Sequence, residues 1–278
     1  RKPKSSEIIF SEIKEIETAE IFTNFFIKPT EKNIVVDIPL TPDFATCESC
    51  ETELFDEKNP RYFYPFTTCT QCGPRYSITK KFPFERENTA IEVFKMCPNC
   101  LAEYQNPDDV RFHSQTNSCP NCGIKIWLKD NQGNEFKGSN KEIFEKLAEE
   151  LSKGKIIALK NTAGYLLMCD ATNSEAVSEL RKRKRRPTKP FAVLFSGIST
   201  MQDYLEISEL QIQHFKSSES PIIVTKIKDK KDLAIDEISP NMNTIGAMFP
   251  YSGTLKLIAK TFGKPLIATS GNFHGSPI

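Results

Sequence analysis

Eight of the nine cysteines form four Cys-x-x-Cys pairs between residues 47 and 122, and this spacing constrains the fold more than any other feature of the chain. The pairs are Cys47/Cys50, Cys69/Cys72, Cys97/Cys100 and Cys119/Cys122. The gaps between successive pairs are 18, 24 and 18 residues, so the pattern repeats with a period of 50. Arg61 and Arg111 are also 50 residues apart, which indicates an internal duplication.

Two Cys-x-x-Cys turns supply a tetrahedral site of four thiolates, which is the ligand set of structural Zn²⁺. The four pairs therefore predict two structural zinc sites. Three alternatives are a redox-active pair, ligands of an iron–sulfur cluster, and disulfides of a secreted protein. Each would explain one cysteine pair or suit one cellular compartment, but none explains the repeated spacing. The short gap within each repeat favours one site made by the first two pairs and one made by the last two, with an interleaved arrangement as the alternative. The ninth cysteine, Cys169, is expected to be a buried core thiol.

The length of 278 residues favours two compact units or one large one, and 38% hydrophobic residues suffice for a core. With 37 basic and 36 acidic residues, a surface that binds polyanions must arise from local clustering. No apolar stretch is long enough for a membrane span or a signal peptide, so we expect a cytoplasmic protein without a membrane partner. The chain begins with Arg1 and ends just after a loop of small residues, which indicates a piece of a longer protein.

The composition divides the chain into three regions. Residues 1–40 alternate apolar and polar positions, as in the closing strands of a small α+β unit. Residues 41–128 form the cysteine region, in which metal replaces much of the core. The polar stretch Asp130–Asn140 then leads into an α/β pattern over residues 138–278.

The α/β pattern opens with a helix. Ser139 and Glu142 form a capping box, and Gly154 closes the helix. Strands are expected at Ile156–Lys160, Tyr165–Cys169, Phe191–Phe195, Ile222–Lys226 and Pro265–Thr269, and further helices between Asn173 and Pro187, at Met201–Lys216 and at Thr254–Thr261. Alternating helices and short apolar strands predict the α/β class, with a twisted mixed sheet against which helices pack.

Residues 181–189 carry seven cations and no acid. Such density is costly through self-repulsion unless anions compensate it. On a continuous helix, Lys182 and Arg186 would share one side, and the following Pro-Thr-Lys-Pro turn would direct Lys189 back toward the next strand. Several fixed cations suit a polyphosphate. A solvated basic face and a nucleic-acid patch are the alternatives.

Two loops favour the nucleotide interpretation. Asn161–Gly164 and Thr269–Asn272 each follow an expected strand, and their small residues allow backbone N–H groups to approach an anion. The sequence has neither a P-loop nor a Rossmann fingerprint.

These motifs together resemble the HypF family, carbamoyltransferases of nickel–iron hydrogenase maturation. Residues 38–46 and the eight cysteines are similar to the zinc-finger region of that family. The chain also resembles the YrdC-like domain of that family. The similar positions are Lys160, residues 164–165 and 169–173, and the stretches 180–192, 239–246 and 269–272. The resemblance covers residues 38–278.

The resemblance implies a cytoplasmic enzyme with three activities. An acylphosphatase-like domain, of which residues 1–40 would be the tail, releases carbamate from carbamoyl phosphate. The YrdC-like domain joins carbamate to ATP, with Mg²⁺, as carbamoyl adenylate. A C-terminal domain, beyond this chain, carbamoylates a cysteine of the partner protein HypE. The family also implies two structural Zn²⁺ ions.

Carried over position by position, the resemblance assigns Lys184, Arg186 and Lys189 to the ATP phosphates, where they would neutralise charge on the leaving pyrophosphate. Ser270 and Asn272 would orient the phosphates or the acyl adenylate.

Lys160 and Thr162 would face the carbamate. Two departures from the family pattern occur near these positions. Ala163 stands where the family usually has glycine, and residues 251–255 lack its usual Pro-Leu-His run.

Other functions share parts of these features. Threonylcarbamoyl-adenylate synthases of tRNA modification share the YrdC-like half, but the zinc pairs argue against them, and neither tRNA nor double-stranded RNA is expected as a partner. Some O-carbamoyltransferases of antibiotic synthesis share the whole architecture, so they are a further alternative. A zinc-finger protein that binds nucleic acid is the alternative from another class, although no aromatic residues interleave with the 181–189 cations as a stacking platform.

Overall fold

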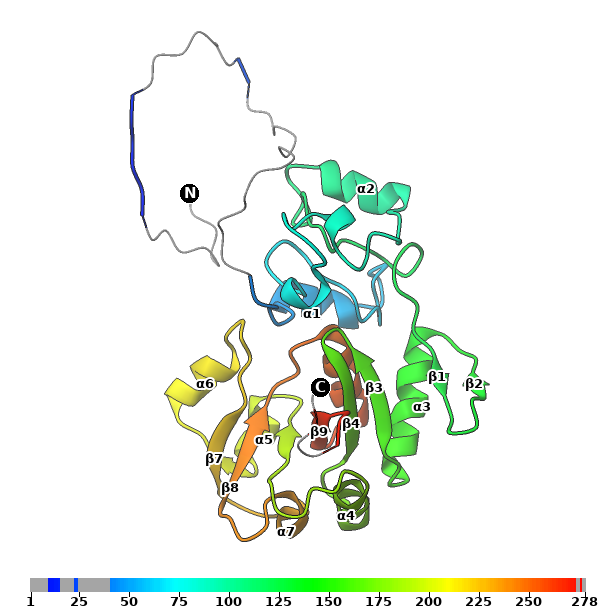
Figure 1. The fold of residues 1–278 in the computed structure, drawn as a ribbon, viewed down its shortest axis with the longest axis vertical. Coiled ribbons are helices and arrows are strands. Elements are labelled where there is room, and N and C mark those ends of the chain that lie inside the picture. Colours follow the sequence, from blue (N-terminus) through cyan, green and yellow to red (C-terminus); the bar gives the residue numbers. More distant parts are fainter. Residues whose placement is uncertain (1–9, 16–22, 25–40, 274–275, 277–278) are drawn as a thin grey trace. The chain divides into compact units, whose positions relative to one another are not determined.

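The computed structural model describes residues 10–15, 23–24, 41–273 and 276. The chain divides into two units, residues 1–39 and residues 40–278. The helices and strands described below all belong to the second unit (Figure 1). The expected acylphosphatase-like tail at residues 1–40 lies almost wholly outside the described residues. Within the described ranges, no helix combines the length and the apolar character needed to cross a membrane.

The cysteine region, which we call the finger region, contains two short helices in equivalent positions. α1 (Glu48–Phe55) and α2 (Pro98–Gln105) each begin directly after the first cysteine of a pair and carry the second cysteine at a buried position. Two 3₁₀ helices, η1 (Tyr76–Ile78) and η2 (Arg86–Asn88), lie between the repeats. The structure thus repeats the duplication of the sequence.

A small hairpin and a helix follow the finger region. β1 (Leu128–Lys129) and β2 (Glu135–Phe136) pair antiparallel, so the expected linker contains a hairpin strand. α3 (Asn140–Ser152) begins at the predicted capping box, in which Ser139 accepts from the Glu142 amide and the Glu142 carboxylate accepts from the Ser139 amide.

A mixed seven-stranded sheet with the order β3-β4-β9-β5-β8-β7-β6 forms the second half of this unit (Figure 1). The strands are β3 (Ile157–Asn161), β4 (Gly164–Asp170), β5 (Ala192–Leu194), β6 (Leu205–Glu206), β7 (Ile223–Ile227), β8 (Thr244–Met248) and β9 (Leu266–Ser270). β5 pairs with β8 in parallel, and the other neighbours pair antiparallel. The expected α/β class with a mixed sheet is confirmed.

Helices cover both faces of the sheet. On one face, α3 and α8 (Gly253–Phe262) share an apolar cluster with the strands. On the other face, the cluster contains residues of α4 (Ser174–Arg183), α5 (Ile198–Gln202), α6 (Glu209–Phe215) and α7 (Ile235–Ile238). The expected single helix Met201–Lys216 is wrong, because β6 separates α5 from α6 and a second capping box at Ser208 starts α6. β8 is a strand that the sequence pattern does not predict, since Gly246 interrupts its apolar residues.

The first finger shares its core with the α/β half. Leu54 on α1 and Phe63 are buried in the same apolar cluster as Phe144 and Leu255, which belong to α3 and α8. A salt bridge of 2.6 Å between Lys256 Nζ and a Glu51 carboxylate oxygen crosses the same boundary. Finger and sheet therefore stabilise each other.

Gly253, the first residue of α8, lies directly against the first finger. A Cβ atom at this position would be 2.3 Å from the carbonyl oxygen of Pro65. We expect Gly253→Ala to lower the free energy of unfolding by about 1–3 kcal/mol, because backbone must move to relieve the clash. Urea denaturation measures the change, and Gly197→Ala, where a Cβ meets nothing within 4 Å, is the matched control. Equal stability of the two variants would contradict this close packing.

Candidate functional site

The eight paired cysteines gather into two clusters. The first cysteine cluster contains Cys47, Cys50, Cys69 and Cys72, and the second contains Cys97, Cys100, Cys119 and Cys122. Within each cluster all sulfurs lie within 4.8 Å of one another. The two Cys-x-x-Cys pairs of each repeat therefore lie together, as the short gap within each repeat predicts. The interleaved alternative is wrong.

The sulfur distances match a tetrahedral metal site. The Sγ–Sγ distance is 3.7 Å between Cys47 and Cys69, and 3.6 Å between Cys100 and Cys122. Four thiolates at about 2.3 Å from Zn²⁺ would be separated by about 3.8 Å, whereas a disulfide requires about 2.05 Å. Burial raises the pKa of the Cys100 thiol, so a thiolate there needs a cation beside it. The donor set thus fits a four-coordinate soft metal.

A cavity of about 680 Å³ lies where the end of β9 meets α4 and the start of β4, and we call it the lysine cavity. Its lining residues are Ala163, Gly164, Tyr165, Leu167, Arg183, Lys184, Gly271, Asn272, Phe273 and Ser276. The structure therefore brings the basic stretch and the loop after β9 into one cavity, although they are far apart in the sequence.

Lys184 is buried and holds the loop after β9. It is 3% exposed, and its Nζ donates to the carbonyl oxygens of Ser270 and Asn272 at 2.5 and 2.6 Å. A third contact reaches Asn272 Oδ1 at 3.3 Å, and the Ser270 hydroxyl donates to the same oxygen at 2.5 Å. Burial, followed by the charge of Arg186, lowers the pKa of Lys184 below its ordinary value. Three residues predicted from the sequence as one site thus contact each other.

Two arginines of the basic stretch bond to backbone carbonyls. Arg181 donates to carbonyls at the C-terminal end of α7, and Arg186 donates to the Lys189 carbonyl at 3.0 Å. Both guanidinium groups lie over the Phe191 ring, at 4.6 and 4.9 Å from its centroid. Backbone carbonyls therefore compensate part of the positive charge of these arginines. From the sequence alone, a bound anion is expected to compensate it.

The expected helical alignment of Lys182 with Arg186 is wrong. α4 ends at Arg183, and Arg185 has a left-handed φ of 52°, so the chain leaves the helix before Arg186. Pro187 disfavours the α conformation at the residue before it, so Arg186 is unsuited to continue the helix.

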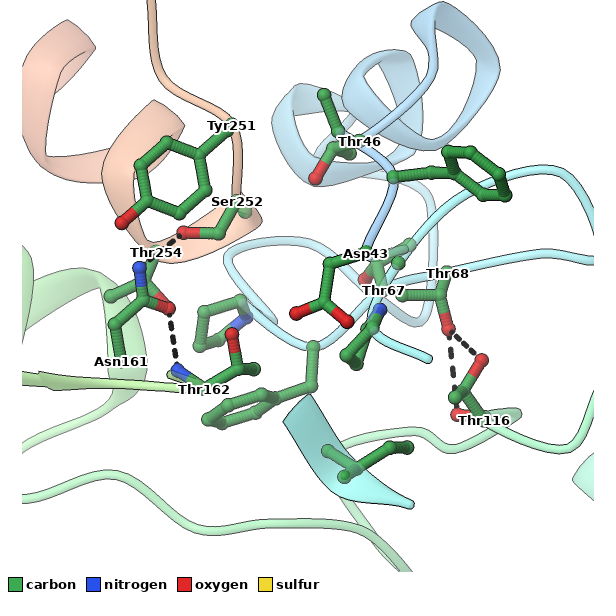
Figure 2. A pocket seen from close by; sticks show the side chains of 18 of the residues that line it. Asp43, Thr46, Thr67, Thr68, Thr116, Asn161, Thr162, Tyr251, Ser252 and Thr254 are labelled. Carbon is green, nitrogen blue, oxygen red and sulfur yellow. Dashed lines mark hydrogen bonds between the residues drawn. The ribbon is translucent and has the colours of Figure 1, made fainter. Parts of the chain in front are cut away.

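A second cavity, of about 390 Å³, lies between the finger region and the β3–β4 turn, and we call it the finger cavity (Figure 2). The α/β half contributes residues 161–163, 218–220 and 251–254, and the finger region contributes residues 43–46 and 65–68 together with Ile78, Ile91, Phe94 and Ile124. Asn161 Nδ2 donates to Ser252 Oγ at 3.2 Å, and Asn161 Oδ1 accepts from the Thr162 amide at 2.9 Å. Thr162 therefore belongs to a cavity that the fingers help to build.

The two cavities differ in charge. Arg86 is the one basic residue among the described residues that line the finger cavity, and its guanidinium donates to the carbonyls of Phe94, Gln115 and Asn117. The lysine cavity has two basic lining residues, Arg183 and Lys184, although Lys184 Nζ also donates to protein oxygens. Ala163 lines both cavities, so they are neighbours.

The remaining site candidates lie at the surface. Lys160 is exposed on β3, with its Nζ 5.3 Å from the centroid of the Tyr165 ring, and it does not line either described cavity. Lys189 is also exposed. Neither side chain reaches Lys184 through a described hydrogen bond.

Sequence reasoning missed the aromatic lining of the lysine cavity. Tyr165 and Phe273 both contribute to it, and the Arg185 guanidinium lies 5.5 Å from the Phe273 ring centroid. Gly271 is the available signal: its amide donates to the Tyr165 carbonyl at 2.7 Å, and a Cβ there would be 2.8 Å from the Tyr165 Cβ. A small residue between Ser270 and Asn272 therefore marks where the two strand ends meet.

Family models match both halves of this unit. The HypF finger model matches residues 46–79 and 96–129, and the Sua5/YciO/YrdC model, described as telomere recombination, matches residues 149–278. The first contains the two cysteine clusters and the second contains the sheet with the lysine cavity. Fold and site thus define a protein with HypF-type fingers joined to a YrdC-like domain.

Similar proteins narrow this class. Carbamoyltransferase HypF of Rhodobacter capsulatus is 39% identical over 238 residues, which are 86% of this chain and 31% of that protein. The crystal structure of full-length HypF in a phosphate- and nucleotide-bound form matches with a TM-score of 0.80 and 37% identity, covering 87% of this chain and 31% of that one. A threonylcarbamoyl-AMP synthase of Vibrio campbellii is 26% identical over 137 residues, 48% of this chain and 74% of that protein. Over most of its length the chain is similar to HypF proteins, and it spans about a third of the HypF proteins that it matches.

Proposed function

We propose that this chain binds ATP and forms carbamoyl adenylate from carbamate derived from carbamoyl phosphate, as part of a carbamoyltransferase of hydrogenase maturation. The observation that carries the proposal is the contact of Lys184 with Ser270 and Asn272 in one cavity. The relatives support it, because one is named a carbamoyltransferase and another a synthase of an acyl-AMP. A cysteine of HypE as acceptor and a cytoplasmic location belong to the same proposal.

The reaction would occur at the lysine cavity. A carbamate oxygen attacks the α-phosphorus of ATP, the new C–O–P linkage forms, and the bond to pyrophosphate breaks. Lys184, Arg186 and Lys189 would neutralise the charge that builds on the leaving pyrophosphate, and Mg²⁺ bound with the nucleotide would supply further positive charge. Catalysis of this kind depends on positioning, and the Lys184 clamp would fix the loop that presents Ser270 and Asn272.

The carbamate would enter from the side of the finger cavity. Thr162 lines that cavity, and its neighbour Ala163 lines both cavities. Among the described lining residues, the finger cavity has one cation, Arg86, and the lysine cavity has two, so the lysine cavity suits the phosphates of ATP better. Lys160 would approach carbamate from the exposed face of β3.

Each cysteine cluster would hold one structural Zn²⁺ through its four thiolates. The Sγ–Sγ distances of 3.6 to 3.8 Å support four-coordinate binding without a water ligand. Zinc bound in this way supplies stability to the finger region and takes no part in the chemistry.

ATP–pyrophosphate exchange tests the proposal on this chain. We expect labelled pyrophosphate to enter ATP when ammonium carbamate is supplied directly, because adenylate formation is then reversible. Threonine with bicarbonate is the parallel substrate. Exchange that requires threonine would assign threonylcarbamoyl-adenylate synthesis instead, and no exchange with either substrate would overturn adenylate formation by this chain.

A further inference from the structure

Arg61 and Arg111, which keep the 50-residue spacing, each cross into the other finger. Arg61 belongs to the first repeat, yet its two terminal nitrogens donate to the Glu103 carboxylate on α2 at 2.9 and 2.5 Å. Arg111 belongs to the second repeat, and its Nη2 donates to Glu53 on α1 at 2.6 Å. The two arginines are only 3% and 4% exposed. Each finger thus encloses a charged side chain that the other finger supplies.

A second pair of contacts brings both arginines next to the cysteine clusters. Arg61 Nε donates at 3.0 Å to the carbonyl of Ser118, the residue directly before the third cysteine of the second cluster. Arg111 Nε donates at 3.0 Å to the carbonyl of Thr68, the residue directly before the third cysteine of the first cluster. The two donor residues are 50 positions apart in the sequence, and so are the two acceptor residues, so the two contacts are equivalent. Each arginine therefore fixes the chain that leads into a ligand pair of the other cluster.

Hydroxyl contacts join the same segments. Thr68 Oγ1 donates to Thr116 Oγ1 at 2.9 Å, and the Tyr64 hydroxyl lies 3.1 Å from Ser118 Oγ. The position equivalent to Tyr64 is Ser114, whose Oγ is buried without a hydrogen-bond partner among the described residues. A serine is too short to span the distance that the tyrosine spans, so this contact exists on one side only.

We propose that the two cysteine clusters take up metal as a coupled pair. When one finger loses its metal and unfolds, the other finger loses the arginine that holds the segment before its third cysteine, and its own arginine loses its carboxylate partner. Metal at one cluster therefore favours metal at the other. Arg61 and Arg111 are positioning residues in this view, because they act on the ligand-bearing segments and do not touch the metal. The inference rests on the structural zinc sites proposed above.

Native mass spectrometry during zinc titration tests the coupling on the reduced, metal-free chain. For two equal and independent sites, about half of the chains carry one zinc at half saturation, whereas coupling depletes this species. We expect mainly chains with no zinc or two zincs. A one-zinc population of half or more would overturn the coupling. A wild-type chain that binds no zinc would instead overturn the metal sites themselves, so the two failures are distinct.

Variants test the route of the coupling. Removing the first cluster with Cys69→Ser and Cys72→Ser should weaken zinc binding at the second cluster by about tenfold or more. In the Arg61→Met/Arg111→Met background, the same cysteine changes should have little further effect on that affinity. Lys58→Met, at an exposed position close to Arg61, is the control that keeps full coupling. An unchanged second-cluster affinity after loss of the first cluster would contradict the proposal, and the wild-type titration decides the matter if the double variant does not fold.

Discussion

Removing metal from this chain is expected to unfold the finger region and to destabilise the sheet beyond it. Structural zinc contributes about 10–16 kcal/mol of folding free energy per site in small fingers, and the finger region has few other sources of stability. Leu54 and Phe63 leave the core shared with α3 and α8 when the first finger unfolds. Losing large apolar side chains from a core costs about 2–5 kcal/mol each. We therefore expect the melting temperature of the sheet to fall by about 10 °C or more.

Hydrogen exchange read by mass spectrometry locates this effect. After treatment with a strong chelator, amides of α1 and α2 should lose protection completely, and those at the start of α8 should lose part of it. Protection should return when zinc is restored. Cys169→Ala is the control, because Cys169 is a buried thiol outside both clusters and its removal should leave the response to chelator intact. Finger amides that stay protected after the metal is gone would contradict a structural role for it.

The sequence predicts the finger region well because the residues that define its structure lie close together along the chain. A Cys-x-x-Cys turn positions two sulfurs within four residues, and the equal gaps within each repeat bring two turns together. The capping box at Ser139 is equally local, and α3 begins where it predicts. In the Met201–Lys216 stretch, by contrast, helix-favouring residues continue through a position where pairing with β7 imposes a strand, and that pairing is not visible in the local pattern.

The site is predicted only in part for the same reason. The basic stretch at 181–189 and the small residues around Ser270 both contribute to the lysine cavity, through Arg183, Lys184, Gly271 and Asn272. Its internal arrangement depends on carbonyls from distant segments, such as those at the end of α7 that accept from Arg181. The finger cavity depends on the packing of the first finger against the sheet, so no single motif indicates that Thr162 lines it.

Replacing Lys184 by methionine is expected to reduce carbamate-dependent ATP–pyrophosphate exchange by about 10²–10³-fold, the usual effect of losing one preorganised donor. The change removes a cation from the lysine cavity and leaves the carbonyls of Ser270 and Asn272 without their donor. Lys182→Met removes the same charge from an exposed position two residues earlier and is the matched control. Equal loss in both variants would mean that general charge, not the clamp, governs the reaction.

The alkaline limb of the pH profile separates the ammonium charge of Lys184 from its packing. Burial and the neighbouring Arg186 both disfavour the charged form and lower the pKa of Lys184. The clamp is therefore intact at low pH, and exchange should fall as pH rises through a value below that of an ordinary lysine. Lys184→Arg stays charged throughout this range, so we expect a slower enzyme whose alkaline limb is absent. If that variant keeps the same alkaline limb as the parent chain, the group that titrates is not Lys184, and its charge is not what the reaction requires.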